Sequence, residues 1–311
     1  MKIAIFDTNM FKFTSDMYRT WREVGREVTR FHTLRLPDLE AADVAWFDCV
    51  DNSLVVATQN HPGLLAGKIV VARCIDLDAW AGHYRGVDWR HVDHLVFIAP
   101  HIMKLVLGDL GDRLPAHVGV HLVPCGVDLE RFTMRADPCS NRDVAVVTKL
   151  WHGKGLDLLL QVIAAAPEFT FHICGEWGLN GIEGGWYRAY VDQFLSHCRN
   201  WTHVGRVDDM NAWLEDKAFA LVCSKKETFS YAAAESAAKG LRPLVHDFYG
   251  AAVIWPDGWR WRTIGECAAA LRDGRYEPDE YRQFVADKYP LKKMMERLDA
   301  VIALGETKDG K

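Results

Sequence analysis

The chain has 311 residues, of which 49% are hydrophobic and 25% are charged; this balance is typical of a globular protein with a sizeable core, and the length suits two domains. The net charge of -5 argues against a protein that coats nucleic acid, because neutralising phosphates needs a basic surface. The eight cysteines include no C-x-x-C pair, which argues against zinc ribbons and thioredoxin-like motifs.

The N-terminus and the apolar runs bear on location. The opening residues, MKIAIFDTNMFK, lack the long apolar region of a signal peptide, and no apolar run reaches membrane-spanning length. We therefore expect a soluble, cytoplasmic protein with no stable membrane insertion.

In the first half, short apolar runs alternate with amphipathic stretches, which is the pattern of a parallel sheet covered by helices. A helix is predicted at Ser15–Thr29, with a serine N-cap and an apolar stripe. Strands are predicted at Lys2–Phe6, Val44–Phe47, Lys68–Ala72, Leu95–Ile98 and Val120–Val123.

The same pattern then restarts. A helix is predicted at Leu156–Ala166, and strands are predicted at Asp143–Thr148, Thr170–Cys174, Val204–Val207, Phe219–Cys223 and Arg242–His246. The restart predicts two doubly wound α/β domains, residues 1–135 and 136–284, joined near Thr133–Asn141, where Pro, Ser and Asn interrupt the apolar pattern. The final segment, Asp279–Leu304, is predicted to form one or two amphipathic helices.

The first candidate for chemistry is VVTKLWHGKG at Val146–Gly155. A strand ends there, a short loop carries Lys149, Gly153 and Lys154, and a helix follows. Free N–H groups and the helix dipole attract phosphate at a helix N-terminus, so two ammonium groups around this turn could clamp a pyrophosphate. The plainer alternative is a solvated loop with two ordinary lysines.

The second candidate is SKKETFSYAAAE at Ser224–Glu235. Glu227 is expected in the loop after a strand and Glu235 about two turns later, on a helix rich in small residues. The helical rise would separate the two carboxylates by about 10 Å, which suits two parts of one elongated ligand. A solvated pair of glutamates is the plainer alternative.

Taken together and in this order, these features resemble the retaining nucleotide-sugar glycosyltransferases of the GT-B group, family four. The segments that carry the resemblance include the E-x7-E pattern and are VGREV (24–28), VPCGVDLERF (123–132), TKLWHGKGLDLLL (148–160), FHICGEWG (171–178) and the stretch 203–245. The resemblance implies two facing Rossmann-like domains, with a C-terminal helix, residues 285–304, crossing back to the first. It also implies a hexosyl- or pentosyltransferase (EC 2.4 type).

The resemblance assigns roles to individual residues. Lys149 and Lys154 would hold the donor diphosphate, Glu227 would contact the transferred sugar, and Glu235 would bind the ribose. The remaining donor-binding positions are Gly153 in the phosphate loop, Gly175 and Val207 in the base pocket, and Thr228, Phe229 and Ser230, whose amides would line the sugar phosphate. Ser230 stands where the family usually has glycine.

The implied reaction retains the anomeric configuration and uses no metal ion or other cofactor. The two lysines and a helix N-terminus would stabilise the charge that develops on the leaving diphosphate. The donor is expected to be a UDP or GDP sugar. The acceptor stays open among saccharides, small molecules and macromolecules, a modified nucleic-acid base included.

The acceptor side departs from the family pattern. Ile75 stands where many relatives have a histidine, so that role could fall to Asp76, Asp78 or His83, or to no residue at all. Asp76 and Asp78 also spell D-x-D, a metal motif of another glycosyltransferase fold, but they lie in the wrong domain to bind the donor. N-capping or acceptor binding is the favoured interpretation.

Three other interpretations remain at this stage. The chain could be a non-catalytic relative that binds nucleotide sugars, or a phage-type transferase that modifies a nucleic-acid base. A dinucleotide-dependent oxidoreductase shares the α/β pattern, but the sequence lacks the G-x-G-x-x-G fingerprint.

Overall fold

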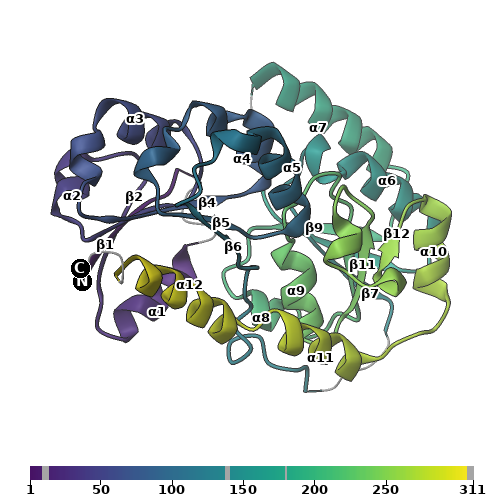
Figure 1. Ribbon diagram of the computed structural model, residues 1–311. Coiled ribbons are helices and arrows are strands. Elements are labelled where there is room, and N and C mark those ends of the chain that lie inside the picture. Colours follow the sequence, from purple (N-terminus) through teal and green to yellow (C-terminus); the bar gives the residue numbers. More distant parts are fainter. Residues whose placement is uncertain (9–13, 137–140, 179–180, 307–311) are drawn as a thin grey trace. The chain divides into compact units, whose positions relative to one another are not determined.

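The computed structural model describes residues 1–8, 14–136, 141–178 and 181–306 (Figure 1). It divides into two compact units: residues 1–126 with the C-terminal segment from Leu291, and residues 127–290. Each unit contains a six-stranded sheet in which every described pairing is parallel. The predicted α/β class with two Rossmann-like domains is therefore confirmed.

The first unit has the strand order β2-β1-β3-β4-β5-β6. Its strands are β1 (Lys2–Phe6), β2 (Glu27–Phe31), β3 (Val44–Phe47), β4 (Ile69–Cys74), β5 (His94–Phe97) and β6 (Gly119–Leu122). The central strands β3, β4 and β5 are buried along their whole length, as expected for a parallel sheet that is covered on both faces.

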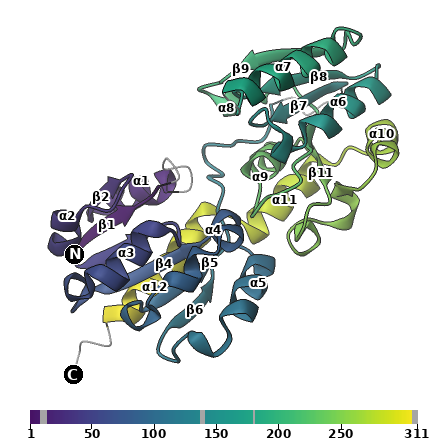
Figure 2. The ribbon, with the colours of Figure 1, turned by 90° about the horizontal axis from the view of Figure 1, so that it is seen from above.

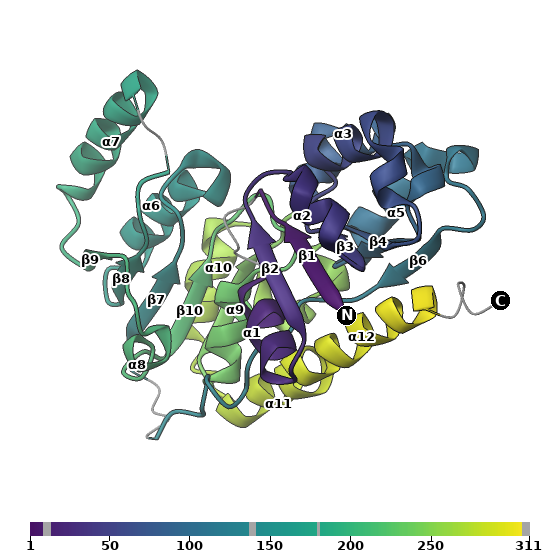
Figure 3. The same ribbon diagram turned by 90° about the vertical axis from the view of Figure 1, so that its left-hand side faces the viewer.

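Helices cover both faces of this first sheet. The helices are α1 (Ser15–Glu23), α2 (Leu36–Ala41), α3 (Asn52–Asn60), α4 (Asp76–Ala81), α5 (Pro100–Leu110) and α12 (Leu291–Glu306). Helices α1 and α12 lie on one face and α2 to α5 on the other (Figures 1 and 3), and Figure 2 shows α12 running beneath β4.

The prediction of one helix over Ser15–Thr29 is wrong in its second half. Helix α1 ends at Glu23, Gly25 takes a left-handed φ of +83°, and the chain turns directly into β2. Glycine adopts this conformation without steric cost, and β-branched Val28 and Thr29 favour the strand that follows. The apolar stripe continued through the turn and concealed the strand.

The second unit has the strand order β12-β11-β10-β7-β8-β9. Its strands are β7 (Asp143–Val147), β8 (Thr170–Cys174), β9 (Trp201–Gly205), β10 (Phe219–Val222), β11 (Arg242–His246) and β12 (Arg260–Trp261). Its helices are α6 (Leu156–Ala165), α7 (Gly181–Leu195), α8 (Met210–Trp213), α9 (Tyr231–Ala238), α10 (Ile264–Arg272) and α11 (Pro278–Lys288).

Apolar side chains of α6, α7 and α10 form one core with the second sheet, whereas α9 packs against α11 and against β10 and β11. The strand predicted at Val204–Val207 lies earlier in the chain than expected: β9 begins at Trp201 and ends at Gly205. In this core the sheet order places β7 and β10 side by side. That neighbourhood determines which loops meet at their carboxyl ends.

The chain passes from one unit to the other at 126/127 and again at 290/291, whereas the boundaries were expected at 135/136 and 284/285. Residues 127–135 and 285–290 belong to the second unit. Arg282 donates hydrogen bonds to the carbonyls of Leu129 (3.1 Å) and Phe132 (2.7 Å), and Arg135 donates to the Glu215 carbonyl (2.8 Å). Part of the expected junction, residues 137–140, lies outside the described residues.

Among the described helices, none is both long enough and apolar enough to cross a bilayer.

Candidate functional site

Two loops of the second unit meet where β7 and β10 end. The Lys225 amide donates to the Gly153 carbonyl (3.3 Å). Gly155 has a left-handed φ of +68°, and a Cβ atom added to it would overlap the Cys223 carbonyl. Only glycine tolerates both the conformation and the close approach, so the loop after β7 can press against the loop after β10.

This contact brings together two of the predicted site residues. Lys154 Nζ lies 2.5 Å from Glu227 Oε1, and the two side chains are 28% and 16% exposed. The lysine stands in a single 3-10 turn, His152–Lys154, immediately before α6. An ammonium group carries three donors, so Lys154 can bind Glu227 and still donate to a phosphate oxygen.

Lys149 is held by a different neighbour. Its alkyl chain lies along Gly178, where an added Cβ atom would be 3.0 Å from Lys149 Cγ and Cε. The Leu150 amide donates to the Glu176 carbonyl (2.8 Å), and the Gly178 amide donates to the Leu150 carbonyl (3.0 Å). Lys149 is thus an exposed cation fixed against the loop after β8.

The predicted base-pocket residues come from the ends of β8 and β9. The Gly175 amide donates to the Gly205 carbonyl (2.8 Å), and a Cβ atom on Gly175 would overlap the Thr148 carbonyl. Burial raises the pKa of the Cys174 thiol, while a hydrogen bond from the Val207 backbone lowers it. Gly175 and Val207 therefore lie close together, beside the loop that carries Lys149.

Residues 228–230 connect Glu227 to helix α9, and all three are buried. The Phe229 ring contacts Tyr231, Trp255 and Tyr289 at centroid distances of 5.5, 5.5 and 4.9 Å. Ser230 has a φ of +79°, a conformation that costs a non-glycine residue about 1 kcal/mol or more.

Glu235 lies on α9 and is half-buried. Helix α9 begins at Tyr231, so four of the residues from Glu227 to Glu235 lie outside the helix. The predicted separation of about 10 Å rested on helical rise, and that rise applies only to the second half of the interval. The roles of Glu227 and Glu235 remain predictions.

In the first unit, two backbone amides hold the carboxylate of Asp78. The residue is 3% exposed, and its Oδ2 atom accepts hydrogen bonds from the amides of Val50 and Ile75, both at 3.0 Å. Burial raises the Asp78 pKa to about 7. The carboxyl group therefore ties the loop after β3 to the start of α4.

The other predicted acceptor-side residues are more accessible. Asp76 begins α4 and is half-buried, whereas His83 is exposed in the turn after that helix. Ile75 is buried at the end of β4. Among the described residues, no group of three or more His, Cys, Asp or Glu side chains could hold a metal ion.

The structure also shows buried acidic residues that the sequence analysis missed. Asp7 and Asp48 follow β1 and β3 and are fully buried. Arg73 forms an ion pair with Asp48 (2.7 Å), and Thr14 donates to Asp7 (2.6 Å). Burial raises the Asp48 pKa to about 6, although Arg73 opposes the shift. An aspartate directly after each apolar run, in IAIFD and VAWFD, was the available signal.

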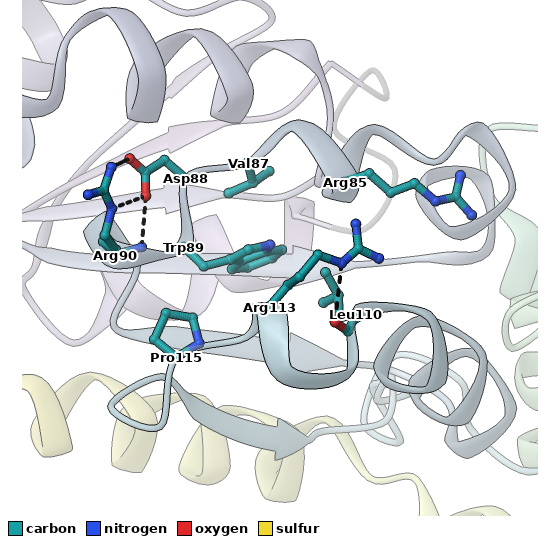
Figure 4. Close-up of a pocket in the computed structure, with 8 residues that line it drawn as sticks. All are labelled: Arg85, Val87, Asp88, Trp89, Arg90, Leu110, Arg113 and Pro115. Carbon is teal, nitrogen blue, oxygen red and sulfur yellow. Dashed lines mark hydrogen bonds and ion pairs between the residues drawn. The ribbon is translucent and has the colours of Figure 1, made fainter.

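A hollow of about 360 Å³ lies elsewhere in the first unit (Figure 4). Its lining residues are Arg85, Val87, Asp88, Trp89, Arg90, Leu110, Arg113 and Pro115. They precede β5 and β6, so the hollow lies at the amino ends of these strands. Figure 4 shows Arg90 bonded to Asp88 and Arg113 bonded to the Leu110 carbonyl, and Arg85 pairs with Asp109.

Ligands of open parallel α/β sheets bind at the carboxyl ends of the strands, which is the edge occupied by Lys154 and Glu227. The three arginines of the hollow already have acidic or carbonyl partners. We therefore assign the candidate site to the loops after β7 and β10.

Comparison with known proteins shows which solved structures have a similar fold. No protein-family model and no curated protein sequence matches the chain. Sucrose-phosphate synthase from Thermosynechococcus elongatus is similar in structure, with 13% identity, a TM-score of 0.79, and coverage of 99% of this chain and all of that chain.

Two further solved structures are similar to the chain. HepE of Anabaena, in complex with UDP, has 12% identity and a TM-score of 0.78 over 97% of this chain and all of that one. The pneumococcal O-GlcNAc transferase GtfA, in complex with UDP and GlcNAc, has 14% identity and a TM-score of 0.64 over 84% of this chain and 56% of that one. Over nearly its whole length, the chain therefore has the GT-B fold of these solved structures.

Proposed function

We propose that the chain is a glycosyltransferase that takes a sugar from a nucleoside diphosphate donor, with UDP as the favoured nucleotide. The observation that carries the proposal is the pairing of Lys154 with Glu227, which brings together a cation for the diphosphate and a carboxylate for sugar hydroxyls. UDP occupies the similar structures of HepE and GtfA, and HepE was also solved with UDP-glucose.

The proposed chemistry follows from the charges at this site. Breaking the bond between sugar and phosphate leaves negative charge on the diphosphate. Lys154, Lys149 and the positive end of the α9 helix dipole supply positive potential there, as preorganised groups that need no rearrangement during the reaction. This supports transfer that does not depend on a metal ion.

Retention of configuration is part of the same proposal. The acceptor hydroxyl would attack from the face of the leaving group, and a phosphate oxygen of the donor would accept its proton. No side chain then has to act as general base, which agrees with the buried, apolar Ile75 at the position of the family histidine.

We place acceptor recognition in the first unit, at the carboxyl ends of its strands. Asp76 and His83 are accessible enough to contact a hydroxyl-bearing acceptor, whether a saccharide, a small molecule or a macromolecule. Asp78 has a positioning role, because two backbone amides already occupy its carboxylate.

A melting-temperature screen against UDP, GDP, ADP, CMP and NAD, with the matching sugar nucleotides, tests the donor proposal. A ligand at 100 times its dissociation constant stabilises the folded state by about 2.7 kcal/mol, which raises the melting temperature by several degrees for a domain of this size. We expect one nucleoside diphosphate to raise it, and Lys154→Ala to abolish the shift.

The neighbouring Lys225 supplies the matched control. It is exposed and pairs with Asp157 at 2.8 Å, so Lys225→Ala should keep the shift. Lys154→Ala leaves the Glu227 carboxylate unpaired, and the double variant Lys154→Ala/Glu227→Gln removes this charge. The affinity of the double variant for the nucleoside diphosphate should remain far below that of the wild type, because the lysine is still missing. A wild-type protein that responds only to NAD, or to none of these ligands, contradicts the proposal.

A further inference from the structure

Ser230 has an unusual backbone conformation for a residue with a side chain. Its φ of +79° makes it the one non-glycine residue with positive φ in the part of the chain that the structure describes. This conformation is sterically unfavourable for serine and free for glycine. Such residues cluster at functional sites, where the surrounding structure imposes the conformation.

Contacts on both sides of Ser230 impose it here. The preceding residue, Phe229, is 2% exposed and fixed by the rings of Trp255 and Tyr289. The Ser230 carbonyl accepts the Ala234 amide (3.2 Å) in the first turn of α9. The backbone can therefore not relax without displacing an aromatic core residue or the start of the helix.

The serine hydroxyl makes no hydrogen bond within the described protein that would offset the conformational cost of the positive φ. Serine is a favoured N-cap residue because its oxygen can accept an amide of the first helical turn, yet Ser230 precedes α9 and makes no such bond. No other hydrogen bond joins its hydroxyl to the described residues, and the residue as a whole is only 7% exposed. A polar group on so buried a residue normally has a partner, either in the protein or in a molecule that reaches it.

The groups around Ser230 indicate what that partner is. The first-turn amides of α9 point away from any intrahelical acceptor, and Glu227, three residues earlier, holds the Lys154 ammonium group at 2.5 Å. Helix amides and an ammonium group together form a site for phosphate. We propose that the Ser230 hydroxyl donates a hydrogen bond to a diphosphate oxygen of the donor nucleotide. This inference rests on the proposed function.

Two substitutions separate the hydroxyl from the backbone. Ser230→Ala removes the hydroxyl and keeps the unfavourable φ, whereas Ser230→Gly removes both. We expect both variants to bind UDP about ten-fold more weakly or worse, because a hydrogen bond to a charged group is lost. Ser230→Gly alone should raise the midpoint of urea unfolding.

Calorimetric titration with UDP, and with uridine as the ligand that lacks phosphate, gives the decisive comparison. The loss should be confined to UDP, since the hydroxyl is assigned to a phosphate oxygen. If Ser230→Gly binds UDP as tightly as the wild type, the hydroxyl has no ligand role and the inference is wrong, while the proposed function stands. If the wild type binds none of the nucleoside diphosphates, the proposed function itself is wrong, and this inference is wrong with it.

Discussion

At the scale of single residues, Gly155 determines how closely the loops after β7 and β10 approach. A Cβ atom there would overlap the Cys223 carbonyl, and the φ of +68° already favours glycine. We expect Gly155→Ala to lower the free energy of unfolding by about 2–4 kcal/mol, because steric overlap with backbone adds to the conformational cost. Its affinity for UDP should fall as well, since Lys154 moves away from Glu227.

Gly274 is the matched control for this prediction. It lies in the same unit with a φ of +72°, and an added Cβ atom would meet nothing within 4 Å. Gly274→Ala should therefore cost only the conformational term of about 1 kcal/mol. Urea unfolding of both variants measures the difference, and equal losses would show that the contact with Cys223 has no effect.

Asp78 makes a prediction about pH. Burial raises its pKa in the folded state to about 7 from an ordinary value of 3.8, so the protonated carboxyl favours folding. This contribution is complete below about pH 4 and is lost as the pH rises through 7. Asp78→Asn cannot titrate, and its amide oxygen can still accept from Val50 and Ile75. We therefore expect the variant to gain stability relative to the wild type as the pH rises.

Urea unfolding at about pH 5 and pH 8 tests this prediction, because the interval spans the folded-state pKa. The difference between wild type and Asp78→Asn should shift in favour of the variant at the higher pH. Parallel stability curves would mean that Asp78 titrates alike in the folded and unfolded states.

Sequence analysis identified single residues of the site but not their pairing. Lys154 and Glu227 were both candidates, assigned to different parts of the donor. Their contact depends on β7 and β10 being neighbours in the sheet, and strand order is a long-range property that local patterns do not encode. Asp7 and Asp48 were missed for a similar reason, because the approach of Asp7 and of Arg73 to Asp48 occurs only in the folded sheet.

At the scale of secondary-structure elements, α12 completes the core of the first unit. Its buried residues Met294, Leu298 and Val301 join the cluster that contains Trp21. Asp299 on the same helix accepts from Trp21 Nε1 (2.7 Å) and Arg26 (2.6 Å). The helix is thus bound both by apolar contacts and by a polar clamp at α1.

Leu298→Ala should reduce the free energy of unfolding by about 2–5 kcal/mol, the usual cost of a cavity left by a buried leucine. Leu298 is 1% exposed. The exposed Glu296 on the same helix is the control, and Glu296→Ala should change stability by no more than about 0.5 kcal/mol. Small effects for both substitutions would show that α12 contributes little to the first unit.

Most central strands were predictable, because buried parallel strands read as continuous apolar runs. The edge strands were harder. Strand β2 was assigned to a helix and β9 was displaced, since half-exposed edge strands carry mixed residues such as EVTRF and WTHVG. Helix α9 was expected from its alanine run, but its start at Tyr231 follows from the backbone of Ser230.

At the scale of the whole molecule, the repeated α/β pattern was sufficient to predict two Rossmann-like domains. It did not fix where the chain crosses between them. Near the first crossing, long-range hydrogen bonds of Arg135 and Arg282 join residues 132–135 to the second unit, and neither arginine stands out in the sequence. The C-terminal helix was expected to begin at residue 285. Residue 285 instead belongs to α11, which ends at Lys288, and Tyr289 and Pro290 separate α11 from α12.

Hydrogen exchange in the presence and absence of UDP tests the central claim most directly, which is that a nucleotide donor binds where β7 and β10 end. We expect added protection at residues 148–156 and 224–233, and loss of that protection in Lys154→Ala. Protection confined to the first unit, for example at the hollow lined by Arg85, Arg90 and Arg113, would contradict the claim.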